Sequence, residues 1–339
     1  MPLFCLIMPH KLLKKTALFT CVTMMSPAIY AEWNAKFDTN MYYTDDVALF
    51  SVTRRLSLKD DPTQPVVDRP NQGGDFVYEP DVELEWSGHN ALGALTVGME
   101  AGGYVFANQS DFSHGLYEFN VSQTLATDTK ISVDYNFVPD LFLGQNVLRQ
   151  ENSAESEQDE KLTNHFWSLH VDQPVSNDIT IRLLGRYGLR HYNAPFQHRD
   201  TQFWTVGPHL EWRVHPDIEL LVGYHYERGI ADHQHTINVS DDISYVNHYA
   251  SAEIKLRLTE RLSSVFIIDY EKNTFTSQYI NDEHHDASEN LFQGEVELVY
   301  TLDNVTNIKL GWQHGNRKVT TESQNIKNNN VWLGVEYFF

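Results

Sequence analysis

Histidines and carboxylates gather in two polar stretches of the sequence, and together they could hold a metal ion. Imidazole and carboxylate ligands suit divalent transition metals. However, no pair among them has the fixed spacing of a metal motif on a rigid element. We therefore predict no metal site and no other cofactor. The residues concerned are His233, His235, Asp282, Glu283, His284, His285 and Asp286.

The same residue types could also catalyse hydrolysis. A hydrolase needs a nucleophile, a histidine base and a group that orients the histidine. The polar stretches contain His191, His198, Asp200 and Asp241, but the sequence assigns a partner to none of them. A lipase-like His-x-Ser-Asn-Gly pattern does not occur in the chain. We therefore predict that the protein is not an enzyme.

Carboxylates also occur at every second position of several segments, on the face opposite the apolar residues. If that face lines an interior, its acids outnumber its bases, and some carboxylates need water or cations as partners. The predicted inward acids are Asp81, Glu83, Glu85, Glu100, Glu118, Asp134, Glu211, Glu219, Glu227, Glu253, Glu295, Glu297 and Glu336, joined by Asp269 and Glu271 from a segment that is apolar on both faces. The predicted inward bases are Arg182, Arg186, Arg213, Lys255, Arg257 and Lys309.

The elements that must position these residues have the period of β-strands. For example, Leu220 and Val222 alternate with Glu219 and Gly223. The connections between the segments alternate between short and long. The segments are 33–43, 78–87, 91–102, 115–124, 128–138, 162–172, 178–190, 200–213, 217–229, 245–258, 262–275, 287–301, 305–316 and 328–339.

Composition narrows the class of protein and its compartment. The 339 residues include 46 acidic and 25 basic side chains, which argues against a nucleic-acid partner because phosphates need Lys and Arg. Residues 1–31 have the pattern of a secretory signal peptide, with lysines before an apolar stretch and Ala31 at the expected cleavage point. Both cysteines lie in this segment, so we expect no disulfide or thiol chemistry in the mature chain, 32–339.

Two all-β folds fit the period. A soluble sandwich explains the alternation, but it explains neither the strict alternation of loop lengths nor strands much longer than the usual length of about 5 or 6 residues. A membrane barrel explains both, because strands of about 9 to 11 residues cross the hydrocarbon and closure removes every edge. We predict a single antiparallel transmembrane β-barrel of about 14 strands (roughly 12 to 16), with short periplasmic turns and long extracellular loops.

The signal peptide, the alternating segments and the aromatic C-terminus resemble those of the bacterial outer-membrane β-barrel proteins. The resemblance implies a place in the outer membrane, in contact with lipid and lipopolysaccharide, and implies no particular oligomeric state. In that class the aromatic end of the last strand serves the barrel-assembly machinery as an insertion signal. The matching residues here are Val335, Tyr337 and Phe339.

The acidic interior favours a narrow, water-containing, cation-preferring channel of the porin type for small solutes. One alternative is an export or assembly partner in an exopolysaccharide or secretion system, because residues 37–51 resemble the opening of porin-like barrels linked to such systems. The other alternative is an outer-membrane hydrolase, since catalytic residues on a barrel can come from distant strands.

Three local features carry expectations of their own. Pro208 lies inside a predicted strand, where it removes a ladder hydrogen bond, so we expect a bulge there. Residues 47–58 fit the first long loop, an extra strand or a plug folded inward. The acidic run within 151–160 is expected to be a solvated loop. A more specific interpretation is that this run contacts neighbouring lipopolysaccharide through divalent cations.

Overall fold

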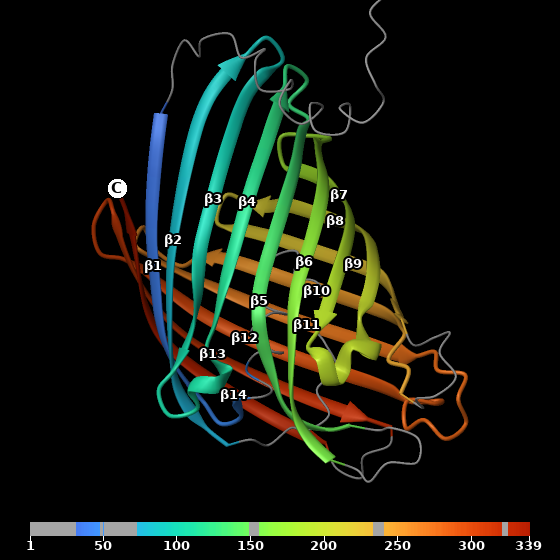
Figure 1. Ribbon diagram of the computed structural model, residues 1–339. Helices are drawn as coiled ribbons and strands as arrows, with labels where there is room; N and C mark the ends of the chain where they lie inside the picture. The colour runs from blue at the N-terminus through green and yellow to red at the C-terminus, as the bar shows by residue number, and fades with distance from the viewer. Residues whose placement is uncertain (1–31, 48–49, 51–72, 149–155, 233–240, 321–324) are drawn as a thin grey trace, which may run out of the picture.

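The fold is a closed β-barrel in which each strand pairs with the next along the chain (Figure 1). The computed structural model describes residues 32–47, 50, 73–148, 156–232, 241–320 and 325–339. The strands formed by these residues are β1 (Glu32–Thr44), β2 (Asp75–Asn90), β3 (Gly93–Phe106), β4 (His114–Leu125), β5 (Lys130–Leu148), β6 (Ser156–Pro174), β7 (Ile179–Tyr192), β8 (Thr201–His215), β9 (Ile218–Ala231), β10 (Tyr245–Arg257), β11 (Leu262–Phe275), β12 (Ser288–Thr301), β13 (Thr306–Val319) and β14 (Ile326–Phe338). Two short 3-10 helices, η1 (Ser110–Phe112) and η2 (Ala194–Arg199), lie between strands.

The barrel closes where β1 pairs with β14 as well as with β2. All neighbouring pairs of the described strands are antiparallel, and connections of two to four residues, such as 91–92 and 126–129, all lie at one end, the short-turn rim. The longer connections all lie at the other end, the long-loop rim. The predicted fourteen-stranded antiparallel barrel is therefore confirmed. No helix among the described residues is long and apolar enough to cross a membrane.

The outer face of the barrel is apolar. Met99, Leu183 and Leu333 point outward and keep 55%, 57% and 58% of their surface accessible. The described strands are 12 to 19 residues long, which exceeds the roughly 9 to 11 residues needed to cross the hydrocarbon. Because closure also pairs the backbone of every strand with two neighbours, the barrel meets the conditions for a position within lipid.

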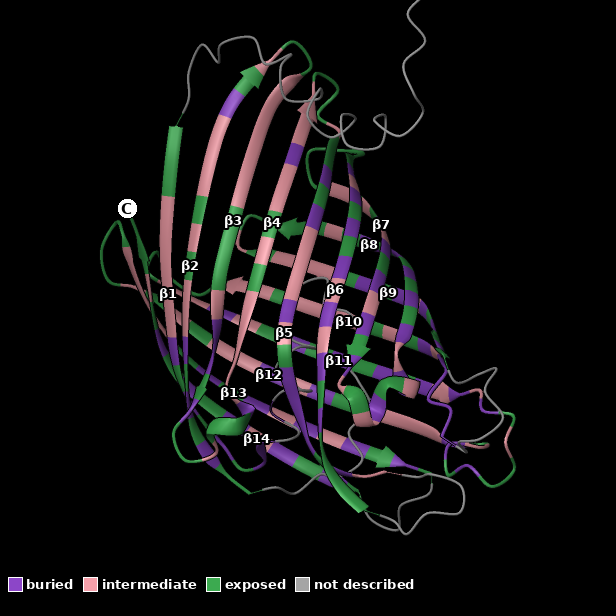
Figure 2. Ribbon diagram, in the orientation of Figure 1, coloured by how far each residue is buried: buried purple, intermediate pink, exposed green. Residues whose placement is uncertain are grey.

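Near the long-loop rim, side chains fill the interior. Figure 2 shows buried residues of β2, β3 and β5 gathered toward the long-loop ends of these strands. Two apolar clusters meet there, and Leu116 packs against both. The first contains Val138, Leu141, Leu143, Leu162, Tyr192, Phe196, Ala231, Ile243, Tyr245, Phe275 and Ala287, and the second contains Tyr42, Val47, Phe50, Val77, Tyr104, Phe106, Phe112, Phe142 and Trp332.

The second cluster bears on the predicted first loop. The ring centroid of Phe50 lies 5.3 Å from that of Tyr42 and 5.4 Å from that of Tyr104, and both Val47 and Phe50 are buried. Val47 and Phe50 therefore pack inside the barrel directly after β1. Residues 48–49 and 51–58 lie outside the part of the chain that the structure describes.

The prediction of a bulge at Pro208 is wrong. Val206 pairs with Tyr226 and His209 with Gly223, so the register of β8 against β9 is unchanged across Pro208. The irregularity of this strand lies further on, between Arg213 and His215. A missing N–H therefore removes a ladder bond here without displacing the chain.

Strands β5 and β6 extend beyond their predicted ends. Their pairing continues past register shifts between Val138 and Leu141 and between Phe142 and Gly144. Residues 157–160, expected in a solvated loop, belong to β6, and Glu160 is fully buried. The predicted features that lie outside the described residues are the signal peptide 1–31, Glu151, Glu155, His233 and His235.

Candidate functional site

Three carboxylates form a row across the inner face of neighbouring strands. Glu83 on β2 pairs with Glu100 on β3, and Glu100 pairs with Glu118 on β4. Side chains directly opposite each other have Cβ atoms about 4.5 to 5.5 Å apart, and like charges there repel. Lys36 on β1 is the next register partner, with its Nζ 2.9 Å from Glu83. This acidic row (Glu83, Glu100 and Glu118) therefore places three carboxyl groups side by side on one part of the inner wall.

The acidic row meets water although it faces inward. Glu100 has the same strand parity as Tyr104 and Phe106, whose side chains are buried inside the barrel. Nevertheless Glu100 is exposed, and the side chain of Glu83 keeps 37% of its area accessible. The interior at the level of the row is thus open to solvent, unlike the filled interior near the long-loop rim.

Most of the other predicted inward acids lie against polar partners. Burial of a carboxylate is tolerated when donors replace the lost water. Asp81, which pairs with Asp38 and Gly102, lies beside the row. The partners are Ser87 for Glu85, His170 for Asp134, Arg182 for Glu211, Lys255 for Glu219 and Glu253, Thr205 and Tyr245 for Glu227, Tyr249 for Asp269, Asn247 for Glu271, Gln313 for Glu295, Trp332 for Glu297 and Asn307 for Glu336.

The predicted bases are largely engaged by nearby groups. Those with described contacts are Arg182 with Asp172, Arg186 with Ser168 and the ring of Phe166, Lys255 with Glu253, Arg257 with Asp217 and Lys309 with Asp38. Arg213 is exposed near the short-turn rim. The prediction missed Lys36, Arg190 and Arg317, whose strand parity places them on the same inner face. The period-2 pattern itself could have identified Lys36 and Arg190, whereas Arg317 lies one residue beyond the predicted segment 305–316.

A second polar centre lies in the filled interior, where connections from the long-loop rim meet at Arg199. Arg199 is fully buried at the end of η2. Its guanidinium donates to both oxygens of Glu160, at 3.0 and 3.1 Å, and to both oxygens of Asp241, at 2.8 and 3.2 Å. This fork-to-carboxylate geometry joins β6, η2 and the connection between β9 and β10.

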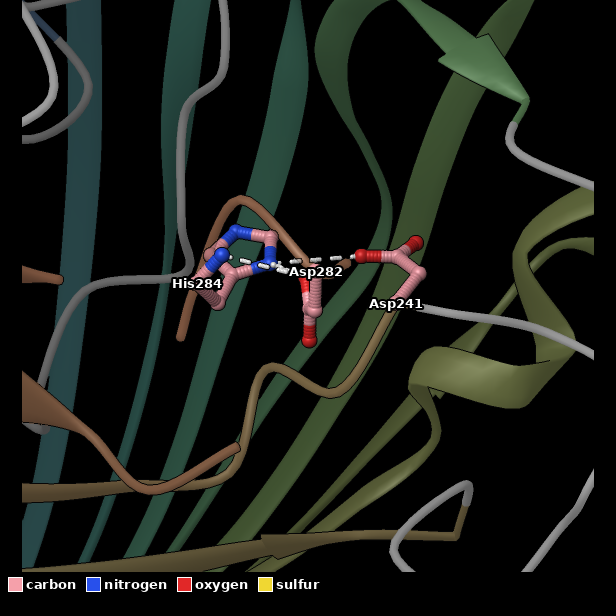
Figure 3. Close-up of side chains that lie close together, drawn as sticks. All are labelled: Asp241, Asp282 and His284. Atoms are coloured by element: carbon pink, nitrogen blue, oxygen red, sulfur yellow. Dashed lines mark hydrogen bonds and ion pairs between the residues drawn. The ribbon is translucent and has the colours of Figure 1, made fainter. Parts of the chain in front are cut away.

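The same connection meets the loop between β11 and β12 through His284 (Figure 3). The Nδ1 atom of His284 lies 3.0 Å from Asp282 Oδ1 and 3.4 Å from Asp241 Oδ1. The backbone N–H of Asp242 donates to Asp282 Oδ2 at 2.8 Å. All four residues are buried. We call Glu160, His198, Arg199, Asp241, Asp242, Asp282 and His284 the loop cluster.

The pKa values of two carboxylates in the loop cluster, Asp241 and Asp282, are lowered by their partners. Burial raises the pKa of Asp241, but the charge of Arg199 and hydrogen bonds from His198, His284 and Arg199 outweigh it and hold that pKa well below its ordinary value. Burial likewise raises the pKa of Asp282, and hydrogen bonds from His284, Ser277 and backbone N–H groups lower it overall.

The structure pairs the residues considered for hydrolysis. His198 Nε2 lies 2.7 Å from Asp241 Oδ2, and His191 Nδ1 lies 3.5 Å from Asp200 Oδ2. Asp200 also accepts a hydrogen bond from the backbone N–H of Tyr192 at 2.6 Å. The sequence could not assign these pairs because their members come from different elements or from opposite sides of η2.

The histidine-rich stretch near residue 284 divides in the structure. Asp282 and His284 come together with Asp241, which lies far from them in the sequence. His285 has a different partner, because its Nδ1 lies 3.0 Å from the carbonyl oxygen of Ser277. Asp286 is exposed, and Glu283 Oε1 lies 4.0 Å from His284 Nε2.

The C-terminal residues lie at the short-turn rim. Val335 and Tyr337 point outward from β14 and are partly exposed. Phe339 follows the strand with 76% of its surface accessible, and its ring centroid lies 4.7 Å from that of Tyr337. An aromatic pair therefore ends the chain at the outer surface of the barrel.

Comparison with known proteins identifies the fold. No protein-family model matches the chain, and no curated protein sequence matches it. The outer membrane channel DcaP of Acinetobacter baumannii has a similar structure, with a TM-score of 0.51 and 9% identity over 91% of this chain and 97% of that chain. A loop L8 deletion mutant of OmpT, an outer membrane protein of Vibrio cholerae, is also similar, with a TM-score of 0.49 and 10% identity over 91% of this chain and 99% of that chain. An anion-selective porin from Comamonas acidovorans has a TM-score of 0.48 and 8% identity over 91% of this chain and 99% of that chain. At these identities the likeness concerns the fold, which is that of the bacterial outer-membrane β-barrel proteins.

Proposed function

We propose that this outer-membrane barrel is a narrow channel that favours small cations over anions. The observation that carries the proposal is the acidic row, because Glu83, Glu100 and Glu118 face the interior and are open to water there. Carboxylates in a low-dielectric wall attract cations and repel anions. Lys36 offsets part of this charge through its ion pair with Glu83.

The filled interior supports a narrow channel. The two apolar clusters involve residues from most strands and occupy the long-loop half of the barrel. Phe50 and Phe196 of η2 belong to these clusters. Barrels of 16 to 18 strands leave wide aqueous channels, whereas smaller barrels are filled by side chains to a greater extent.

Charge neutralisation in single channels tests this function. Replacement of Glu83, Glu100 and Glu118 by Gln, singly and together, should lower the cation-to-anion permeability ratio while keeping side-chain size. Glu260→Gln is the matched control, because Glu260 lies exposed in a short turn outside the barrel. An unchanged ratio in the triple variant would show that the acidic row does not set selectivity.

A second candidate function follows from the filled interior. A barrel whose long-loop half is packed with side chains also fits an export or assembly partner that conducts only when its loops are displaced. A purified barrel that inserts into planar bilayers without conducting would favour this alternative over a channel that is open at rest.

We propose no enzymatic activity. The pair of His198 and Asp241 has the histidine–carboxylate contact of a hydrolase, but the same carboxylate is engaged by both Arg199 and His284. A carboxylate that orients a catalytic histidine is normally directed at that histidine, which in turn serves a nucleophile. Hydrolysis of phospholipid or peptide substrates by the purified barrel would contradict this assignment.

A further inference from the structure

The loop cluster brings three metal-ligand atoms together from two loops that are distant in sequence. His284 Nδ1 lies 3.0 Å from Asp282 Oδ1 and 3.4 Å from Asp241 Oδ1, and all three ligand atoms lie within 4.8 Å of one another (Figure 3). Ligand atoms of a tetrahedral Zn²⁺ with bonds of about 2.0 to 2.2 Å are roughly 3.3 to 3.6 Å apart. The cluster therefore matches a metal site after small adjustments of side chains.

The loop cluster contains more carboxyl groups than basic groups. Its four carboxylates, Glu160, Asp241, Asp242 and Asp282, are at most 5% exposed. Among the described residues, the cations bonded to them are Arg199 and, when protonated, His198 and His284. The cluster thus holds four buried carboxyl groups against one guanidinium and two imidazoles. Buried charge of this kind must be neutralised by a partner or a metal ion.

Asp242 gives an independent indication of a missing ligand. Its side chain is fully buried, and its Oδ2 atom has no hydrogen-bond partner among the described residues. Its backbone N–H donates to Asp282 Oδ2 at 2.8 Å, so the residue lies directly against one of the candidate ligands. A buried carboxylate oxygen without a partner is costly unless a cation or a bound water satisfies it.

The groups around the candidate ligands resemble the outer shell of metal sites. Ligating carboxylates and histidines are usually oriented by further hydrogen bonds. Here Arg199 and His198 hold Asp241, at 2.8 and 2.7 Å, and Ser277 Oγ donates to Asp282 Oδ2 at 2.5 Å. The Oδ1 atoms of both carboxylates face His284 Nδ1. Each Oδ1 also accepts one hydrogen bond, from Arg199 Nη2 at 3.2 Å in Asp241 and from the backbone N–H of His284 at 3.0 Å in Asp282.

We propose that Asp241, Asp282 and His284 bind one divalent transition-metal ion of the Zn²⁺ class inside the barrel. One imidazole and two carboxylates suit such an ion better than Mg²⁺ or Ca²⁺, which prefer oxygen ligands alone. The ion links the connection between β9 and β10 to the loop between β11 and β12, and so fastens two loops in the filled interior. This site is independent of whether the barrel conducts.

Metal binding by the folded full-length barrel tests the proposal. After treatment with a chelator, calorimetric titration with Zn²⁺ should show one saturable site per chain, and Co²⁺ should give visible absorption bands of tetrahedral coordination. His284→Ala and Asp282→Asn should abolish both signals. His198→Gln, which removes an orienting hydrogen bond, should weaken Zn²⁺ binding by about 10- to 100-fold.

His285→Ala is the matched control, because His285 is the neighbouring histidine in the same loop and contacts Ser277 rather than the cluster. It should bind Zn²⁺ as the wild type does. Two results would overturn the proposal. The first is a wild-type barrel with no saturable Zn²⁺ binding and no Co²⁺ bands, which would leave a protonated His284 as the counterion. The second is undiminished binding by folded His284→Ala, which would place the metal on other histidines. The wild-type measurement decides the first point even if a variant fails to fold.

Discussion

Arg199 holds the inward-folded loops, and its removal should release them without unfolding the barrel. Arg199 is fully buried and donates four hydrogen bonds to Glu160 and Asp241 at 2.8 to 3.2 Å. Arg199→Met keeps most of the side-chain volume but leaves two buried carboxylates without their main cation. Removal of one partner from a buried ion pair typically costs about 3 to 5 kcal/mol. The side chain of Arg199 takes no part in the hydrogen bonds between strands. We therefore expect its loss to destabilise the packing of the loops and not the barrel.

Hydrogen exchange measures that cost directly. The backbone N–H groups of Asp242 and His284 donate to the carboxylate of Asp282, at 2.8 and 3.0 Å, so they exchange only when the loops open. A loss of about 3 to 5 kcal/mol corresponds to exchange that is on the order of 10²- to 10⁴-fold faster. Measurement in chelator keeps this effect separate from metal binding. Amides in the middle of β12 and β13 should keep their protection.

Arg257→Met is the matched control for this prediction. Arg257 also pairs with a carboxylate, Asp217, at 2.6 Å, but its side chain is 57% exposed at the short-turn rim. Exposed pairs contribute only about 0.2 to 1 kcal/mol. The reasoning would be refuted if both variants changed loop exchange equally little, or if Arg199→Met exposed strand and loop amides alike.

Three further predictions concern the barrel wall and its assembly. Gly311→Val should destabilise the barrel by about 1 to 3 kcal/mol in denaturant titrations, because a Cβ at this position would lie 2.0 Å from the ring of Trp332. Leu333→Arg places a charge near the middle of the outward face of β14 and should cost about 2 to 4 kcal/mol, whereas Leu302→Arg near a rim should cost about 0 to 1 kcal/mol. Deletion of Phe339 should lower the amount of barrel in the outer membrane more than the conductance of barrels already assembled, as seen by quantitative blotting and by single-channel recording.

These predictions have simple controls. Gly294→Ala should be neutral, because a Cβ there meets no atom within 4 Å. Equal losses for Gly294→Ala and Gly311→Val would show that strand flexibility, and not contact with Trp332, sets the cost. Equal costs at Leu333 and Leu302 would contradict a lipid-facing outer surface. Normal membrane levels of the chain without Phe339 would contradict its role in insertion.

The strands can be predicted from the sequence because the lipid imposes a strict alternation. The alternation predicts a first strand over residues 33–43, and β1 spans Glu32–Thr44. The same parity places Glu83 and Glu100 on the inner face, where their cross-strand pairing is found. Lys36 obeys the same rule, so its inward position also follows from the period alone.

The loop cluster could not be predicted in the same way. Glu160, Arg199 and Asp241 are separated by about 40 residues from one to the next, and their contact depends on loops that turn into the barrel. Toward the long-loop rim, β5 has a run of four buried residues and β6 begins with four exposed residues, so neither strand alternates there. The alternation that predicts a strand is missing there, and residues 157–160 have the composition of a loop although they form a strand.

The reversal potential of the wild-type barrel tests the central claim most directly. The purified protein would be inserted into a planar bilayer of neutral lipid that separates two KCl solutions of tenfold different concentration. The account predicts conducting channels. Their reversal potential should have the sign expected when K⁺ carries most of the current, and it should approach, without reaching, the limit of about 59 mV for a perfectly selective monovalent channel. A reversal potential of the opposite sign would contradict the account, and so would stable insertion with no conductance.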